Sequence, residues 1–150
     1  MVTINMEALS ILFSLAITLC VETWIYMLLN RSSLKLFLVV SLMNLVLNTS
    51  MNIILTIFGT SDLAYWLILS IYEIMTTLVE SLVIFLIFKF KYFKTLLVAL
   101  IANGASFVIG LSLGPLYNNI ILVIIFTSLF FLGYIAIYII TMRLYVSRIK

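Results

Sequence analysis

The chain has 150 residues, of which 66% are hydrophobic and 9% are charged, and its formal net charge is +3. Soluble domains carry about a quarter charged residues, so this composition excludes a soluble protein and indicates an integral membrane protein. One bilayer crossing takes about 20 residues as a helix, so the length leaves room for about five helices and no sizeable soluble domain beside them.

Five apolar runs follow one another along the chain, and each is long enough to cross the hydrocarbon core as a helix. Short polar or basic segments separate these runs, and Pro115 lies where the fourth helix must end. We therefore predict an all-α, polytopic membrane protein that forms a single transmembrane domain. The predicted spans cover about 8–29, 36–58, 64–88, 95–114 and 119–142.

The basic residues indicate how the helices are oriented. They fall in the first loop, the third loop and the C-terminal segment: Arg31, Lys35, Lys89, Lys91, Lys94, Arg143, Arg148 and Lys150. Glu7 and Asp62 fall at the opposite ends of their helices. Because Lys and Arg in short loops stay in the cytoplasm, we expect the N-terminus outside and the C-terminus inside. The same bias explains the positive charge without a nucleic-acid partner.

Two helical hairpins of the chain align with each other. The segment TLCVE, ending at Glu22, matches TTLVE, ending at Glu80; KLFLVVSLMN, ending at Asn44, matches KTLLVALIAN, ending at Asn103. In a chain rich in Leu and Val the apolar identities mean little, whereas the shared Glu, Lys and Asn favour a duplication over chance. We expect both hairpins to run in the same direction through the bilayer, with the last helix packed outside them. The predicted units are two repeats and one extra helix, at about 8–58, 64–114 and 119–142.

Three carboxylates, Glu22, Glu73 and Glu80, lie inside the predicted spans, and no Lys or Arg lies in these spans to neutralise them. A charged residue at the centre of a membrane helix costs about 2.5–3.5 kcal/mol, so such residues face the interior of a bundle and have a partner or a task. Glu73 is the carboxylate that the first hairpin lacks, because Leu15 takes its place in the alignment.

Amide and hydroxyl side chains continue the same helix faces at spacings of three and four residues. The candidate ligand- or ion-binding residues are Glu22, Glu80, Asn44, Asn103, Glu73, Asn48, Thr18 and Thr76. Counted from the loops, the first four of these lie about 10–14 Å from the cytoplasmic surface, so they can meet in one layer. Glu73 lies about 10 Å closer to the outside.

Two carboxyls and two amides at one depth suit a cation, a proton or a small polar solute. They favour a small membrane transport protein, or the membrane subunit of a transporter. Asn and Thr across membrane helices also serve only to hold helices together, so a non-catalytic structural or accessory subunit of a larger complex is the alternative. An intramembrane enzyme is disfavoured, because no nucleophile has an identifiable base beside it.

The chain has no His and a single Cys, Cys20, so we expect no metal site and no cofactor. Five helices are few for a complete carrier, which favours a homo-oligomer or a partner membrane subunit within the lipid bilayer. Aromatic residues near the span ends, such as Tyr65 and Trp66, are interpreted as interfacial anchors. The pattern resembles that of many small duplicated bacterial membrane proteins, which implies a multi-pass protein of a cell inner membrane.

Overall fold

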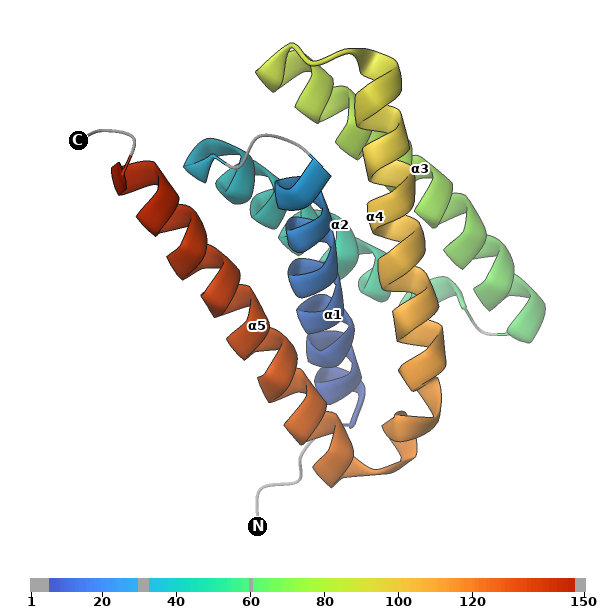
Figure 1. Cartoon of the computed structure of the whole chain (residues 1–150). Coiled ribbons are helices and arrows are strands. Elements are labelled where there is room, and N and C mark those ends of the chain that lie inside the picture. The colour runs from blue at the N-terminus through green and yellow to red at the C-terminus, as the bar shows by residue number, and fades with distance from the viewer. Residues whose placement is uncertain (1–5, 30–32, 60, 148–150) are drawn as a thin grey trace.

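The computed structural model describes residues 6–29, 33–59 and 61–147, and the regular elements of this part of the chain are all helices. Five of them are long and apolar enough to cross a membrane. The predicted all-α architecture with five membrane-length helices is therefore confirmed. The elements (Figure 1) are α1 (Met6–Leu29), α2 (Leu34–Phe58), α3 (Asp62–Phe88), α4 (Tyr92–Leu113), the short 3-10 helix η1 (Gly114–Asn118) and α5 (Ile120–Ser147).

Residues in the connections explain where the helices begin and end. The side chains of Ser33 and Ser61 precede α2 and α3 and accept hydrogen bonds from backbone N–H groups of the first turns at 3.1 and 3.3 Å. Gly59 ends α2, where a Cβ atom would lie 2.5 Å from the carbonyl oxygen of Leu55. Lys89 ends α3 in the left-handed conformation, with φ of 53°.

The helix bounds differ from the predicted spans mainly at the helix ends. Helices α2, α3 and α4 begin before the apolar runs, and α5 continues to Ser147, beyond the predicted end at 142. Hydropathy detects the stretch within the hydrocarbon core, whereas a helix continues through its polar first and last turns. Pro115 lies at the start of η1, where the missing N–H group needs no partner.

Helices α1 to α4 form a ring in which each helix packs against the next, and α5 packs outside the ring along α1 (Figure 1). At this contact a Cβ atom on Gly133 would lie 3.0 Å from Sγ of Cys20, so the two helices approach closely. The hydroxyl of Tyr134 in α5 also donates to Oγ of Ser41 in α2 at 2.8 Å. The last helix, α5, therefore packs outside the other four, as the sequence predicts.

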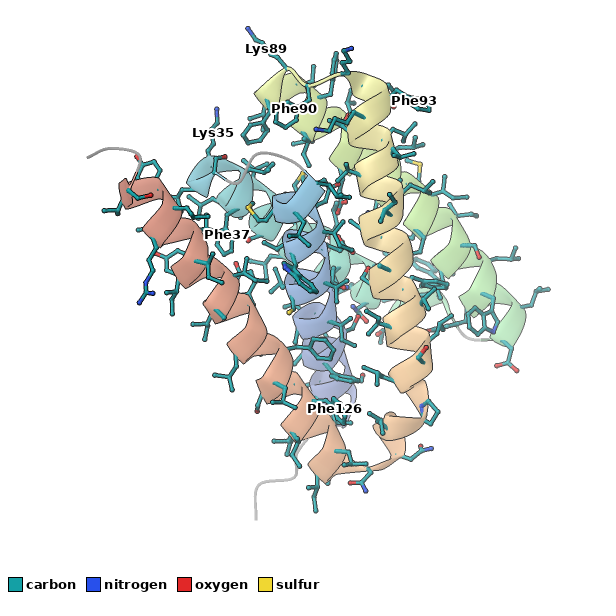
Figure 2. All side chains as sticks on the ribbon, viewed as in Figure 1. Lys35, Phe37, Lys89, Phe90, Phe93 and Phe126 are labelled. Carbon is teal, nitrogen blue, oxygen red and sulfur yellow. The ribbon has the colours of Figure 1, made fainter. Side chains whose placement is uncertain are left out.

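One end of the bundle carries the α1–α2 and α3–α4 connections and the C-terminal end of α5 (Figure 1). Lys35 and Lys89 lie at this end (Figure 2), which we name the basic end. The ammonium group of Lys35 lies 5.5 Å from the ring centroid of Phe88, which stacks on Phe90 at 5.7 Å, so the two connections are neighbours. The predicted orientation also depends on Arg31, Arg148 and Lys150, which lie outside the described residues, and on Glu7, whose side chain lies outside the described part as well.

A buried apolar cluster, which we name the basic-end core, fills the ring near the basic end. Its members come from all four helices of the ring and are Tyr26, Met27, Leu36, Phe37, Val40, Ile84, Val98, Ala99 and Ala102. In a bilayer such a cluster is stabilised by close van der Waals packing, because lipid tails are as apolar as the side chains themselves. This packing leaves little space through the ring at that end.

Candidate ligand-binding site

Four polar side chains, one from each helix of the ring, meet in the middle of the bundle. Glu22 comes from α1, Asn44 from α2, Glu80 from α3 and Asn103 from α4. Their exposed fractions are only 2%, 1%, 1% and 6%, respectively. We name these four residues the polar centre. They are also the residues that the sequence places at one depth.

Neutral donors hold the Glu80 carboxyl group. Asn103 donates from Nδ2 to Oε2 of Glu80 at 2.7 Å, and the hydroxyl of Tyr26 donates to the same oxygen at 3.1 Å. Asn103 is itself oriented by two contacts. Its Nδ2 also donates to the carbonyl oxygen of Ala99 at 3.0 Å, and Thr76 donates from Oγ1 to its Oδ1 at 3.4 Å.

Asn44 links the two carboxyl groups of the centre. Its amide orientation follows from its neighbours, because only the nitrogen can satisfy the carboxyl oxygens. In this orientation Nδ2 donates to Oε2 of Glu22 at 2.7 Å and to Oε1 of Glu80 at 3.0 Å. Ser106 donates from Oγ to Oε1 of Glu22 at 2.6 Å. Each of the four carboxyl oxygens therefore accepts at least one hydrogen bond from a described residue.

The carboxyl groups of Glu22 and Glu80 lie close to each other, because the single amide nitrogen of Asn44 donates to both, at 2.7 and 3.0 Å. Two ionised carboxylates at this distance would repel each other strongly in a poorly polarisable interior. The donors that surround them are amides and hydroxyls, which carry no charge to offset the repulsion. The arrangement is chemically suited to hold one proton shared by the two groups, or one cation beside them.

A cavity of about 600 Å³ lies inside the ring, and the polar centre forms its floor. On each of the four ring helices, the lining residue nearest the basic end is a member of the polar centre. From this floor the lining continues to the opposite end of the bundle, where it includes Ser10, Leu55, Trp66 and Gly114. The cavity therefore extends from mid-bundle toward one end only.

Four side chains of the basic-end core lie directly beyond the floor. Each of them lies four residues from the polar-centre residue of its own helix, on the side of the basic end. They are Tyr26 and Ile84, which come after Glu22 and Glu80, and Val40 and Ala99, which come before Asn44 and Asn103. All four have an exposed fraction of 0%. The packed layer that they form separates the cavity from the basic end.

All eight residues predicted from the sequence line this cavity. Higher in the wall, Asn48 donates from Nδ2 to Oγ1 of Thr18 at 3.0 Å and to Oγ of Ser14 at 3.3 Å, which joins α2 to α1. Thr76 supports Asn103 from α3, as described above. Glu73 is half-buried in the wall, away from the floor.

Two residues that contact the polar centre were not among the predicted site residues. Tyr26 donates to Glu80 and Ser106 donates to Glu22. Their spacing was informative, since Tyr26 follows Glu22 by four residues and Ser106 follows Asn103 by three. The cavity is also lined by aromatic residues, among them Tyr65 and Trp66, for which the sequence indicated only an anchoring role.

The fold and this geometry define a polytopic, all-helical protein of the membrane class, with a buried polar centre at the floor of an internal cavity. Within residues 6–29, 33–59 and 61–147, no group of three or more His, Cys, Asp or Glu side chains is placed to hold a metal ion. Comparison with protein-family models, curated proteins and solved structures found no significant match to this chain.

Proposed function

We propose that this chain is a small membrane transport protein, or the membrane subunit of a transporter, that binds a cation, a proton or a small polar solute at the polar centre. The observation that carries the proposal is the position of Glu22 and Glu80, two buried carboxyl groups bridged by Asn44 at the floor of a cavity of about 600 Å³. Glutamine would make similar hydrogen bonds at a lower desolvation cost, so a purely structural role leaves the carboxyl groups unexplained.

The packed layer beyond the floor supports transport over simple binding. A carrier must expose its site to one side of the membrane at a time, and a site reached from one end and closed at the other has this property. Tyr26, Val40, Ile84 and Ala99 would then be the closed gate. Glu73, higher in the wall, would be a relay on the open side.

A duplicated hairpin is part of the proposal. A pseudo-twofold axis along the membrane normal would place α1 on α3 and α2 on α4. The contact between α1 and α4 would then be equivalent to the contact between α3 and α2, and the structure has both contacts. The bond from Asn44 to Glu22 would correspond to the bond from Asn103 to Glu80. The equivalent bonds and the ring order both support the duplication.

We further propose that the basic end faces the cytoplasm of a cell inner membrane, with the N-terminus outside. The test uses two single cysteines in a Cys20→Ala background and a maleimide that does not cross membranes. Ser61→Cys, in the α2–α3 connection, should be labelled on intact cells, and Lys89→Cys only after permeabilisation. The reverse pattern would contradict the orientation.

The transport test follows proton movement into liposomes that contain the purified protein and an internal pH-sensitive dye. Gradients of Na⁺, K⁺ and the permanently charged organic cation tetraethylammonium are imposed in turn, and we expect at least one to drive proton flux in the wild type. Glu22→Gln and Glu80→Gln should each abolish it. Asp62→Asn is the matched control, because it removes a carboxylate from the exposed first turn of α3. Unchanged flux in both glutamine variants would refute the proposal.

A structural or accessory subunit of a larger complex is the second candidate. It is favoured by the complete hydrogen bonding of Glu22 and Glu80, because such a network also serves to hold four helices together. Purification in a mild detergent separates the two candidates. A stable partner of different sequence in fixed stoichiometry supports the accessory role, whereas a homo-oligomer that is active by itself supports transport.

A further inference from the structure

The lining of the cavity is acidic. Glu22, Glu73 and Glu80 all line it, and its lining includes no Lys or Arg from the described residues. Carboxylates that line a poorly hydrated space focus a negative potential there, because field lines are not spread by surrounding water. The charge of any bound molecule should therefore be positive.

The upper lining is polar on α1 and α2 but mainly apolar and aromatic on α3 and α4. Tyr65, Trp66 and Tyr72 from α3 and Phe107 from α4 all line it, together with leucines. The hydroxyl of Tyr72 donates to the carbonyl oxygen of Leu47 at 3.1 Å, which fixes its ring against α2. Aromatic faces attract cations, and organic ammonium groups are commonly recognised by such rings beside a carboxylate.

The size of the cavity distinguishes an organic cation from an inorganic one. Its volume of about 600 Å³ lies within the range of about 300–1,000 Å³ that is typical of sites for drug-sized ligands. A bare metal ion would leave the apolar walls unused, and the described residues hold no cluster of metal-ligating side chains. A small hydrophilic solute would likewise leave the leucine and aromatic walls without a partner.

Glu73 provides the charge that is free to meet such a ligand. The carboxyl oxygens of Glu22 and Glu80 are occupied by donors from the protein. By contrast, no residue in the described ranges donates a hydrogen bond to the carboxyl group of Glu73, whose backbone carbonyl accepts from Thr76 and Thr77. Trp66 lies seven residues earlier on the same face of α3, about 10 Å toward the open end.

We propose that the cavity binds a hydrophobic organic cation, with its charge beside Glu73 and its apolar body against Trp66 and the neighbouring walls. This inference rests on the proposed function and specifies the class of its substrate. The polar centre below would then supply the proton that is exchanged for the cation, and Glu73 would hold the cation itself. A second charge site also explains why the two hairpins differ at Glu73 and Leu15.

The test is binding of tetraphenylphosphonium chloride to the purified full-length chain in detergent, followed by tryptophan fluorescence. The chain has two tryptophans, of which Trp66 lines the cavity and Trp24 does not. A Trp24→Phe background therefore leaves Trp66 as the reporter in the cavity lining. We expect a saturable change in its fluorescence. Tetramethylammonium, which lacks the apolar body, and neutral triphenylphosphine oxide should each bind about tenfold more weakly or worse, a loss of about 1.4 kcal/mol.

Variants at one position then separate charge from folding. Glu73→Gln should weaken tetraphenylphosphonium binding by about tenfold or more, whereas Glu73→Asp should retain most of the affinity. Asp62→Asn is the matched control, since it removes an equal charge outside the cavity and should leave the affinity unchanged. Equal affinity for tetramethylammonium, or an unchanged affinity in Glu73→Gln, would overturn the inference.

The two proposals fail in different ways. If tetraphenylphosphonium does not bind while Glu22→Gln and Glu80→Gln still abolish gradient-driven proton flux, the substrate class is wrong and the transport proposal stands. If tetraphenylphosphonium binds in a Glu73-dependent manner while both glutamine variants keep wild-type flux, the binding site is supported and the role of the polar centre in transport is refuted.

Discussion

Asn44 is the side chain whose removal should most directly weaken the ring, because its amide is hydrogen-bonded to the carboxyl groups of both hairpins. It donates to Glu22 at 2.7 Å and to Glu80 at 3.0 Å. Hydrogen bonds between membrane helices are worth about 0.6–2 kcal/mol each, so Asn44→Ala should cost about 1–4 kcal/mol of the free energy of unfolding. In a chain of about 150 residues each kcal/mol shifts the melting temperature by about 2–4 °C, so we expect a loss of about 2–16 °C.

The assay is thermal unfolding in one detergent, monitored by tryptophan fluorescence, with Asn52→Ala as the matched control. Asn52 lies two turns further along α2, and its amide donates only within that helix, to the carbonyl oxygen and Oδ1 of Asn48 at 2.9 and 3.0 Å. Its removal breaks no bond between helices, so the melting temperature should change by no more than about 2 °C, for a loss below about 0.5 kcal/mol. A shift in Asn44→Ala no larger than that of Asn52→Ala would refute the bridging role.

Four further substitutions test the packing of the helices, and each is measured by the same unfolding assay. Tyr26→Phe keeps the buried ring but removes the hydroxyl that donates to the centre, and it should cost about 0.6–2 kcal/mol. Ile84→Ala opens a void in the fully buried layer beneath the floor, and it should cost about 2–5 kcal/mol; a smaller loss than in Tyr26→Phe would contradict close packing there. Gly104→Ala adds a Cβ to open space and should stabilise α4 by about 0.5–1 kcal/mol. Gly133→Ala should be the less stable of the two glycine variants, because its Cβ would press on Cys20 Sγ at 3.0 Å.

Much of the fold could be predicted from hydropathy, because a bilayer imposes one length and one kind of backbone pairing on every crossing. The five helices followed from apolar length alone. The shared depth of Glu22, Asn44, Glu80 and Asn103 followed from their distances to the loops, since a helix rises by about 1.5 Å per residue. The structure brings these four side chains together.

The rotation of each helix about its axis was harder to predict. A helix surrounded by lipid on one side and by other helices on the other is apolar all round, so hydrophobic periodicity does not show which face is buried. Only polar residues mark the interior face. For this reason Tyr65 and Trp66 were interpreted solely as anchors, although they also line the cavity. The contact from Tyr26 to Glu80, across two hairpins, likewise depends on rotation.

The differences between the two hairpins give the ring a direction. In the aligned positions Tyr26 corresponds to Ile84 and Leu15 to Glu73, so the first hairpin supplies a hydroxyl beneath the floor and the second supplies a carboxyl above it. Two identical hairpins would present equivalent surroundings to both carboxyl groups of the centre. Here Glu80 accepts a hydrogen bond from Tyr26 and has Glu73 seven residues before it on the same helix. Glu22 instead accepts a hydrogen bond from Ser106 of α4. A proton or cation bound at the centre as proposed would therefore be held asymmetrically, and the next carboxyl group that lines the cavity is Glu73 on α3.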